Sequence, residues 1–304
     1  MATTSPMTGV FPILVTPFDE QSRPDEESLR RLVEFNIAAG VHGLGLALGS
    51  EVYKLSEAER GQVTRIIVDQ ARGRVHVVIN TGAAATDLAV LYSKEAEEQG
   101  ADAVMVLPPT FAPASAEETR DYFRAVSAAV HVPIFLQDTS SGPVSASLAR
   151  QLAEECEHIR YTKVESAPAP LKVAEAVRLA GDKLTVFGGA GGNYLLEELR
   201  RGSRGTMPGC SQPEAFVEIW NLYHAGDLPA ARAVFEHTIV PVNRLAGLGW
   251  GAFYSVHKEL LRQRGVIRTA IVRRPTGGTL DAAGWQELQE VIDGLLESSQ
   301  KSNS

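Results

Sequence analysis

The stretch HIRYTKVESA, residues 158–167, opens with apolar and β-branched residues and then places Lys163 between Thr162 and Val164. It contains one of a series of short apolar runs that alternate with longer segments from residue 10 to about residue 225. In chain order the runs are VFPILVT, GLGLAL, VHVVIN, DAVMVL, PIFLQD, IRYTKV, LTVFGG and GTMPG. Most are continuously hydrophobic rather than alternating, which is typical of parallel strands that are covered on both faces.

The segments between these runs carry helix signals. In the first, apolar residues follow helical spacing at Leu29, Leu32, Val33 and Ile37. Capping boxes open three others, at Ser56 with Glu59, Ser115 with Glu118, and Ser211 with Glu214. Eight strand–helix units in about 215 residues predict a (β/α)8 TIM barrel. A doubly wound sheet is the alternative, but it needs fewer strands, and no Gly-rich dinucleotide loop follows the first run.

The last part of the chain loses its strand signals. From residue 226 onward, DLPAARAVFEHTIVPVNRLAGL and WQELQEVIDGLLES have the patterns of helices. No linker rich in Pro, Gly or Ser precedes them, and their apolar faces need another surface for burial. We therefore expect a barrel over residues 1–225 and a C-terminal helical extension over residues 226–304 that packs on it.

The composition restricts the class of partner. The chain has 304 residues, of which 44% are hydrophobic and 22% charged, and a formal net charge of -8. That charge disfavours nucleic acid and anionic membranes as partners. No apolar run reaches the roughly 18 residues of a membrane span, and the two cysteines are too few for a disulfide framework. We expect a cytoplasmic protein with a small-molecule partner, and the seven histidines show no metal-ligand spacing.

Barrels of this kind carry their chemistry at the carboxyl ends of the strands. The only cation that closes a run here is Lys163. Burial among apolar neighbours lowers the pKa of a lysine from about 10.4 towards neutrality and leaves an amine that attacks carbonyl groups. The resulting Schiff base is an electron sink for reactions at the neighbouring carbon. The structural alternative is an ion pair with Glu165 or Asp138 that holds strands together.

Five motifs together resemble the dihydrodipicolinate synthase / N-acetylneuraminate lyase superfamily of class I aldolases. They are GVFPILVTPFD, GVHGLGLALGSEVYKLSEAER, GADAVMVLPP, VPIFLQD and IRYTKVES, in the family's order and spacing. The resemblance covers the whole barrel and the C-terminal helices. It implies a Schiff base between Lys163 and pyruvate or another 2-oxo acid, and a homotetramer built from dimers. We expect no metal and no organic cofactor.

The turn after the second run departs from the family pattern. The family usually has Gly-Thr-Thr-Gly-Glu there, and its amides and hydroxyls hold the carboxylate of the 2-oxo acid. This chain has Leu48-Gly49-Ser50-Glu51, about one residue shorter and without the threonines. The amides of Gly49 and Ser50 remain candidates for binding that carboxylate. Glu51 is a candidate proton carrier, or alternatively a loop or helix-start cap.

The end of the fifth run departs further. The family has Tyr-Asn there, with the tyrosine as proton shuttle, whereas this chain has Gln137-Asp138. An amide orients a carbonyl or water but does not exchange protons near pH 7. We therefore expect Gln137 to position groups and Asp138 to carry the proton, with Glu51 second and Tyr53 third. The alternative for Asp138 is a turn or salt-bridge residue. The tyrosine often found after the fourth run is also missing, and no arginine follows Asp138 in DTSSGPVS. With these departures we do not expect synthesis of dihydrodipicolinate.

Two further features lie at strand ends. GGAGGN, residues 188–193, joins the seventh run to a helix, and the amides of Gly188, Gly189 and Ala190 are candidates for binding an anion. The alternative is that these small residues leave room above the barrel for the substrate. Cys210 follows the eighth run, and since no histidine is placed to activate it, we expect a structural thiol.

Three functions remain open from the sequence. The first is a Schiff-base lyase that makes or breaks a carbon–carbon bond of a 2-oxo acid. The second uses the same lysine for dehydration, deamination or decarboxylation of a keto acid. The third is a non-catalytic barrel that binds a small acid and has lost its proton relay. The kept Lys163 favours the first two, and the missing tyrosines favour the third.

Overall fold

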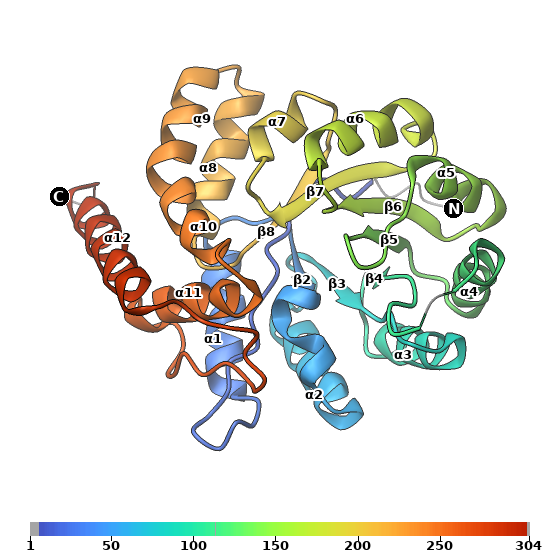
Figure 1. The fold of residues 1–304 in the computed structure, drawn as a ribbon, viewed down its shortest axis with the longest axis horizontal. Helices are drawn as coiled ribbons and strands as arrows, with labels where there is room; N and C mark the ends of the chain where they lie inside the picture. Colours follow the sequence, from blue (N-terminus) through green and yellow to red (C-terminus); the bar gives the residue numbers. More distant parts are fainter. Residues whose placement is uncertain (1–5, 113, 303–304) are drawn as a thin grey trace.

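A computed structural model, which describes residues 6–112 and 114–302, contains an eight-stranded parallel barrel surrounded by helices (Figure 1). The strands are β1 (Gly9–Val10), β2 (Gly43–Leu46), β3 (His76–Asn80), β4 (Ala103–Val106), β5 (Ile134–Asp138), β6 (Ile159–Val164), β7 (Thr185–Gly191) and β8 (Gly205–Pro208). Neighbouring strands pair in the order β1-β8-β7-β6-β5-β4-β3-β2, and a parallel bridge between Ile13 and Gly45 joins the two ends. The predicted TIM barrel is confirmed.

A helix follows each strand. The helices of the barrel are α1 (Glu26–Ala38), α2 (Glu57–Ala71), α3 (Thr86–Glu98), α4 (Ala116–Ala129), α5 (Ala146–Glu155), α6 (Ala169–Ala180), α7 (Leu195–Leu199) and α8 (Pro213–His224). Those that follow are α9 (Leu228–Val234), α10 (Val240–Ala246), α11 (Trp250–Gln263) and α12 (Ala282–Ser302), with a π-helical turn at Phe235–Ile239. Figure 1 shows α9 to α12 gathered on one side of the barrel. Among the described residues, no helix combines the length and the apolar character needed to cross a membrane.

The first strand is shorter than the run VFPILVT predicts. Only Gly9 and Val10 form a regular ladder, because Pro12 has no N–H to donate to one. The rest of the segment still closes the barrel. The N–H of Ile13 donates to the Pro208 carbonyl at 2.8 Å, and that of Leu14 donates to the Gly45 carbonyl at 2.9 Å. The segment therefore contacts both neighbouring strands without being a regular strand itself.

The barrel interior is a packed core. It holds Met7, Phe11, Ile13, Ala47, Val78, Ala103, Met105, Phe135, Tyr161, Phe187 and Met207. Phe187 meets Phe11 and Phe135 edge to face, with ring centroids 5.3 Å apart in both pairs. A second and larger core fills the layer between the strands and the surrounding helices. Because the lower interior is filled, the room that the described part of the barrel leaves for a substrate lies above the carboxyl ends of the strands.

Two of the three predicted capping boxes form. Ser56 with Glu59 and Ser115 with Glu118 exchange reciprocal side-chain to backbone hydrogen bonds. The prediction for Ser211 with Glu214 is wrong, because α8 starts one residue later with Pro213 as its first residue. The Ser211 hydroxyl instead lies 2.7 Å from His257 Nδ1, and Glu214 forms an ion pair with Arg264 at 2.7 Å.

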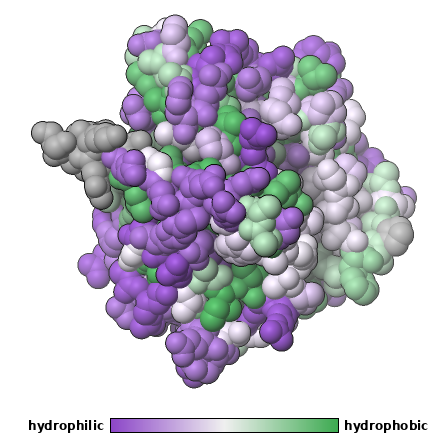
Figure 2. Space-filling model, turned by 60° about the vertical axis from the view of Figure 1, so that its left-hand side comes forward, coloured by the Kyte–Doolittle hydropathy of each residue, from purple (hydrophilic) through white to green (hydrophobic). Residues whose placement is uncertain are grey.

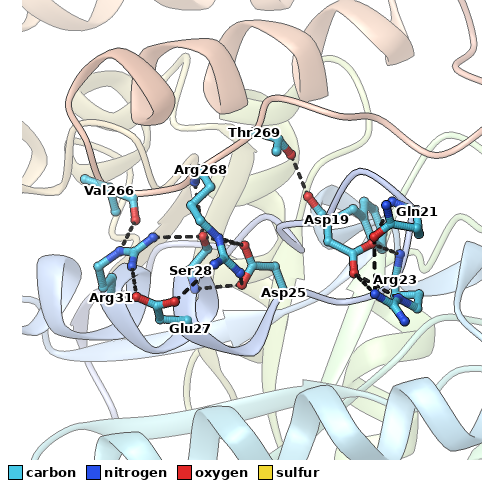
Figure 3. A network of polar contacts seen from close by, with 11 residues as sticks. Asp19, Gln21, Arg23, Asp25, Glu27, Ser28, Arg31, Val266, Arg268 and Thr269 are labelled. Atoms are coloured by element: carbon cyan, nitrogen blue, oxygen red, sulfur yellow. Dashed lines mark hydrogen bonds and ion pairs between the residues drawn. The ribbon is translucent and has the colours of Figure 1, made fainter.

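The segment that follows α11 is fastened to α1 by polar contacts (Figure 3). The Arg268 guanidinium donates to both carboxylate oxygens of Asp25, at 2.6 and 2.8 Å. Beside it, Arg31 Nε donates to the Val266 carbonyl at 3.1 Å. A separate apolar cluster holds α10, α11 and α12 together through residues such as Val242, Leu260 and Ile292. The C-terminal part of the chain also reaches the barrel by apolar contacts, because Ile239, Leu261 and Ile267 belong to the larger core.

The side of the molecule that carries these helices has a mixed surface. Figure 2, in which that side comes forward, shows hydrophobic residues in separate patches among hydrophilic ones. The exposed large apolar side chains in this part of the chain are Leu228, Leu248, Trp250 and Trp285. Apolar surface suitable for contact with another chain is therefore present at several places.

Candidate active site

A cavity of about 500 Å³ opens above the carboxyl ends of the strands. Its lining residues are Ile13, Leu48, Gly49, Thr139, Ser140, Ser141, Lys163, Glu165, Ala190, Gly191, Met207, Pro208, Ala246, Gly247, Gly249, Trp250 and Phe253. Thus one wall comes from the strand ends and the other from the start of α11. Lys163 and Glu165 are the charged side chains in this lining.

Lys163 and Glu165 form the polar centre of the cavity. Lys163 Nζ lies 2.8 Å from Glu165 Oε1, with the side chains 3% and 20% exposed. Alternate residues of a strand face the same side, so both side chains point into the barrel mouth. The ion pair that the sequence left open is therefore present with Glu165 rather than with Asp138. A carboxylate beside an amine can accept the proton that the lysine must lose to become a nucleophile.

Gln137 of β5 holds Glu165, and Asn80 of β3 holds Gln137 in turn. Gln137 Nε2 donates to Glu165 Oε2 at 2.7 Å, and Gln137 Oε1 accepts from Asn80 Nδ2 at 2.9 Å. Both amides are buried. This arrangement gives Gln137 the positioning geometry expected of an amide, with Glu165 as the group it orients. The one glutamate thus contacts both Lys163 and the amide chain.

Gly189 makes room for this pair. A Cβ atom at residue 189 would lie 2.3 Å from Glu165 Cγ and 2.9 Å from Lys163 Cε. Since real Cβ atoms do not approach neighbours so closely, any side chain here would displace the lysine or the glutamate. Gly189 therefore supplies space for the lysine and the glutamate, whereas the alternative for GGAGGN was space for the substrate.

Asp138 lies in a different network, and this corrects the expectation that it carries the proton. It is 1% exposed, and its Oδ1 accepts from the Val144 N–H at 2.9 Å. Its Oδ2 accepts a hydrogen bond from the Ser166 hydroxyl and lies 3.9 Å from Lys172 Nζ. Asp138 therefore joins β5 to the start of α6, which is the structural alternative that the sequence left open for it.

Glu51 is also directed away from the cavity. It is fully buried, and it forms ion pairs with Lys258 at 2.5 Å and with Lys54 at 2.9 Å. The N–H of Arg273 donates to the same carboxylate at 3.0 Å. Burial lowers the pKa of Lys258 to about 8, against the opposing effect of Glu51. The geometry does not support a proton carrier at Glu51. In line with the alternative, the residue starts the short 3₁₀ turn Val52–Lys54, but its side chain makes no capping hydrogen bond and instead anchors the C-terminal segment.

The turn at residues 48–50 offers less than expected for a carboxylate. The Ser50 N–H already donates to the Ala47 carbonyl at 2.8 Å, and its hydroxyl accepts from the Ala47 N–H at 3.0 Å. Ser50 is therefore occupied within its own turn, which corrects its assignment as a binding residue. Gly49 lines the cavity, where a Cβ atom would lie 3.1 Å from the Phe253 ring.

The residues at the end of β7 face two different sides of the strand. Ala190 lines the cavity and has a left-handed φ of 47°, and its role in binding an anion stays a prediction. Gly188 faces the opposite side, where its N–H donates to the Ser203 hydroxyl at 3.2 Å. The predicted set is therefore only partly assembled at the cavity. Lys163, Gly49 and Ala190 line it, Gln137 and Gly189 stand directly behind the pair, and Ser50, Glu51, Asp138 and Gly188 lie elsewhere.

Sequence reasoning missed several lining residues. Glu165 was considered only as an ion-pair partner, although its two-residue spacing from Lys163 places both side chains on one face of a strand. The hydroxyls of Thr139, Ser140 and Ser141 follow β5 directly and so had a positional signal. Trp250 and Phe253 had none, because they come from the start of α11, far away in the chain.

Two expectations concern other chemistry. Cys210 is buried, its Sγ accepts from the Val15 N–H at 3.4 Å, and burial raises the pKa of its thiol to about 12. This is an unreactive environment, as expected of a structural thiol. Among residues 6–112 and 114–302, no group of three or more His, Cys, Asp or Glu side chains is arranged to hold a metal ion.

The chain is similar to known proteins of one enzyme family. The model of the dihydrodipicolinate synthetase family matches residues 6–294. The L-2-keto-3-deoxyarabonate dehydratase of Azospirillum brasilense is 33% identical over 278 residues, covering 88% of each chain. The N-acetylneuraminate lyase of Citrobacter koseri is 43% identical over 122 residues, covering 40% of this chain and 41% of the lyase. The crystal structure of dihydrodipicolinate synthase from Rhodopseudomonas palustris superposes with a TM-score of 0.86 at 26% identity, covering 94% of this chain and 97% of that chain.

Proposed function

The chain belongs to the dihydrodipicolinate synthetase family, and on that premise we propose that it is a lyase that forms a Schiff base between Lys163 and pyruvate or another small 2-oxo acid. Its relatives include both lyases and dehydratases, which supports aldolase-type chemistry. The observation that carries the proposal is the placement of Lys163 Nζ in the cavity, 2.8 Å from a carboxylate. We propose the chemical class of the substrate, a small 2-oxo acid, and no particular compound.

Glu165 is the proposed proton carrier. It takes a proton from the Lys163 ammonium, and the free amine then attacks the C2 carbonyl carbon of the 2-oxo acid. The same carboxyl group returns the proton to the carbinolamine hydroxyl, which leaves as water and gives the iminium ion. Gln137 keeps the carboxyl group aimed at the nitrogen through its 2.7 Å hydrogen bond. Glu165 thus takes the role that the missing tyrosine has in the family.

The iminium ion then draws electrons from the substrate chain. Loss of a proton from C3 gives an enamine in a dehydration, after which a hydroxide at C4 leaves with a proton as water. Breaking the C3–C4 bond gives the same kind of enamine in a retro-aldol cleavage, and the C4 hydroxyl becomes a carbonyl as its proton departs. Deamination and decarboxylation at the same lysine are further members of this class.

Dehydration of a hydroxylated 2-oxo acid is the second candidate, and one observation favours it. Three hydroxyl-bearing residues, Thr139, Ser140 and Ser141, line the cavity together with the aromatic residues Trp250 and Phe253. Hydroxyls and aromatic faces suit a short polyhydroxylated chain. The relative from Azospirillum brasilense is a dehydratase by name. A non-catalytic acid binder is disfavoured, since a paired lysine and glutamate in a cavity serve proton transfer better than binding alone.

We further propose that dihydrodipicolinate is not the product. Gln137 stands where the family has its tyrosine, and the cavity lining carries no arginine among the residues that surround it in the described chain. The assembly that we propose is a cytoplasmic homotetramer, by analogy with the family. The exposed apolar residues of the C-terminal helices and of the α2–α4 side, such as Tyr53, Phe111 and Trp250, are compatible with contacts between chains.

Borohydride trapping tests the proposal. The protein is incubated with a panel of 2-oxo acids, reduced, and weighed by intact mass spectrometry. A trapped adduct reports both the chemistry and the mass of the acid, and peptide mapping is expected to place it on Lys163. The Lys163→Ala variant should give no adduct while it remains folded, whereas Lys183→Ala, which removes an exposed lysine, should trap as the wild type does.

An adduct that persists on another lysine in Lys163→Ala would refute the assignment. A wild-type protein whose thermal stability rises with a 2-oxo acid but which traps no adduct would instead indicate the non-catalytic binder. Once an acid has been trapped, product analysis separates the two enzymatic candidates. Cleavage yields an aldehyde and a shorter 2-oxo acid, and dehydration yields a single product lighter by one water.

A further inference from the structure

Glu198 of α7 is a buried carboxyl group that the proposed mechanism does not use. Its side chain is fully buried, and neither carboxyl oxygen has a hydrogen-bond partner in the described chain. Buried polar groups are almost always hydrogen-bonded, and an isolated buried charge is costlier still. The hydroxyl of Thr206, on β8, is likewise buried and unpartnered. An acid in this position needs a physical reason.

The carboxyl group of Glu198 lies directly behind the candidate active site. A Cβ atom at residue 188 would stand 1.7 Å from Glu198 Oε2, so the carboxyl group fills the space that Gly188 leaves open. The next residue, Gly189, meets Lys163 and Glu165 in the same close way. Successive residues of a strand face opposite sides. Gly188 and Gly189 of β7 therefore lie between Glu198 and the Lys163–Glu165 pair.

Several charged groups act on Glu198 across these packed elements. Burial, together with the negative charges of Glu165, across β7, and of Glu197, on α7, raises its pKa to about 8. The positive charge of Lys163, across β7, acts in the opposite direction. From β8 the facing polar group is the uncharged hydroxyl of Thr206. The coupling is mutual, because two groups that perturb each other's protonation do so equally.

We propose that Glu198 is a positioning residue of the Lys163 site. Its buried carboxyl group is neutral, and when it loses its proton, the resulting negative charge acts across β7 and keeps Lys163 protonated. An anion behind the strand stabilises the ammonium form of Lys163 and repels the carboxylate form of Glu165. Both effects retain a proton within the pair. While Glu198 is neutral, the free amine of Lys163 therefore stays available. Ionisation of Glu198 should slow Schiff-base formation, and only this consequence rests on the proposed function.

The protonation of Lys163 is measured without reference to any substrate. Trace acetylation with acetic anhydride, followed by peptide mass analysis, gives the fraction of Lys163 present as the free amine between pH 6.5 and 9.5. Wild type is compared with Glu198→Gln, which keeps the shape and removes the ionisation. Glu197→Gln, on the same helix, is the matched control. The rate of trapping with pyruvate is recorded over the same pH range as a second readout.

We expect equal acetylation of Lys163 in wild type and Glu198→Gln at pH 6.5. Near pH 9 we expect acetylation about 3 to 10 times faster in Glu198→Gln, because the ionised Glu198 is absent. Glu197→Gln should follow the wild type within about twofold, since its charge is half-exposed and better screened. Profiles that superimpose at every pH, or that differ by a constant factor, would overturn the inference.

A second variant covers the case in which Glu198→Gln does not fold. If Glu198→Gln does not fold, Glu198→Met supplies an apolar side chain of similar length for the same comparison. Failure of both variants to fold would make Glu198 a structural residue and end the proposal. Failure of the proposed function is distinguishable, because a protein that traps no 2-oxo acid would still show the pH-dependent difference in acetylation if Glu198 acts as we infer.

Discussion

Lys163 and Glu165 lie two residues apart on one strand segment and 2.8 Å apart at their charged ends. The pairing depends mainly on strand geometry, in which every second side chain faces the same side. Packing of distant segments then adds the remaining parts. Gln137 comes from β5 and donates a hydrogen bond to the glutamate, and Phe253 comes from α11 and lines the cavity. The chemical centre is thus local in sequence, while its surroundings are assembled from the whole chain.

Replacing Glu165 with Gln should slow turnover by about 10² to 10⁴, the usual share of a general acid–base group. Substrate affinity should change much less, because the amide keeps the shape of the carboxyl group. The measurement is kcat and KM on the acid identified by trapping. Glu175→Gln, on the exposed face of α6, is the control and should retain the wild-type rate. A near-normal rate in Glu165→Gln would mean that water or the substrate's own carboxylate carries the proton.

Restoring the family residue by Gln137→Tyr should not raise kcat. The phenol would replace an amide that donates to Glu165 and accepts from Asn80, so the buried Asn80 amide would lose its acceptor. Gln137→Leu is the companion variant, which removes the same two hydrogen bonds without adding a hydroxyl. We expect both variants to fall below the wild-type kcat. Faster turnover by the tyrosine variant would show that the missing tyrosine, and not Glu165, limits the rate.

The stability of the protein should fall between pH 5 and pH 8 because of Glu198. Its pKa is raised to about 8 in the folded state, from 4.5 for an ordinary glutamate. An acid with a raised folded-state pKa favours folding most below its unfolded value, and this advantage disappears as the pH rises towards 8. The difference amounts to about 3 kcal/mol over that window. Urea unfolding of wild type and Glu198→Gln at several pH values measures it, and parallel pH dependences would contradict it.

Removing Lys258 should destabilise the protein strongly. Lys258→Met would leave Glu51 fully buried with Lys54 as its remaining side-chain partner, at a cost of about 3 to 5 kcal/mol in unfolding free energy. The double variant Glu51→Gln with Lys258→Met should recover much of that loss. Arg262→Met, which breaks an exposed pair with Glu259 on the same helix, should cost about 1 kcal/mol or less. Equal losses in the two single variants would argue against a special role for the buried pair.

Light scattering at micromolar concentrations should give the mass of a tetramer. The expectation comes from the family, and the exposed Phe111, at 90% exposure, is an apolar residue that a neighbouring chain would cover. Phe111→Ser should therefore weaken the assembly if this side forms a contact, while Leu228→Ser tests the opposite side. A monomer across the micromolar range would contradict the prediction.

The elements of the barrel could be predicted because their signals are local. Continuous hydrophobic runs and the boxes at Ser56 and Ser115 depend on neighbours within a few residues, and these were confirmed. The box at Ser211 failed because His257, which lies 46 positions away, binds the serine hydroxyl instead. A sequence pattern has no means of weighing a competing partner that arrives only through folding.

The same limit explains the site. Lys163 could be found because its position at a strand end is a local property. Asp138 was preferred as the proton carrier because it adjoins Gln137, yet adjacent strand residues face opposite sides, and Ser166 and Val144 occupy it there. Glu51 was misjudged because its main partner, Lys258, is 207 positions away. A spacing of two residues correctly indicated that Lys163 and Glu165 share a face. A spacing of one residue wrongly suggested that Asp138 acts beside Gln137.

The pairing of Glu51 with Lys258 limits where the polypeptide can be truncated. A chain that ended at Ala225 would retain all eight strands but would lack Lys258 and the Arg273 N–H, which together meet most of the carboxylate. An expressed fragment of that length should accumulate as an insoluble product, although its boundary looks natural from the pattern of strands. Co-expression of residues 226–304 as a separate polypeptide should restore soluble material, since the two pieces would then complete each other as in a split-protein reporter.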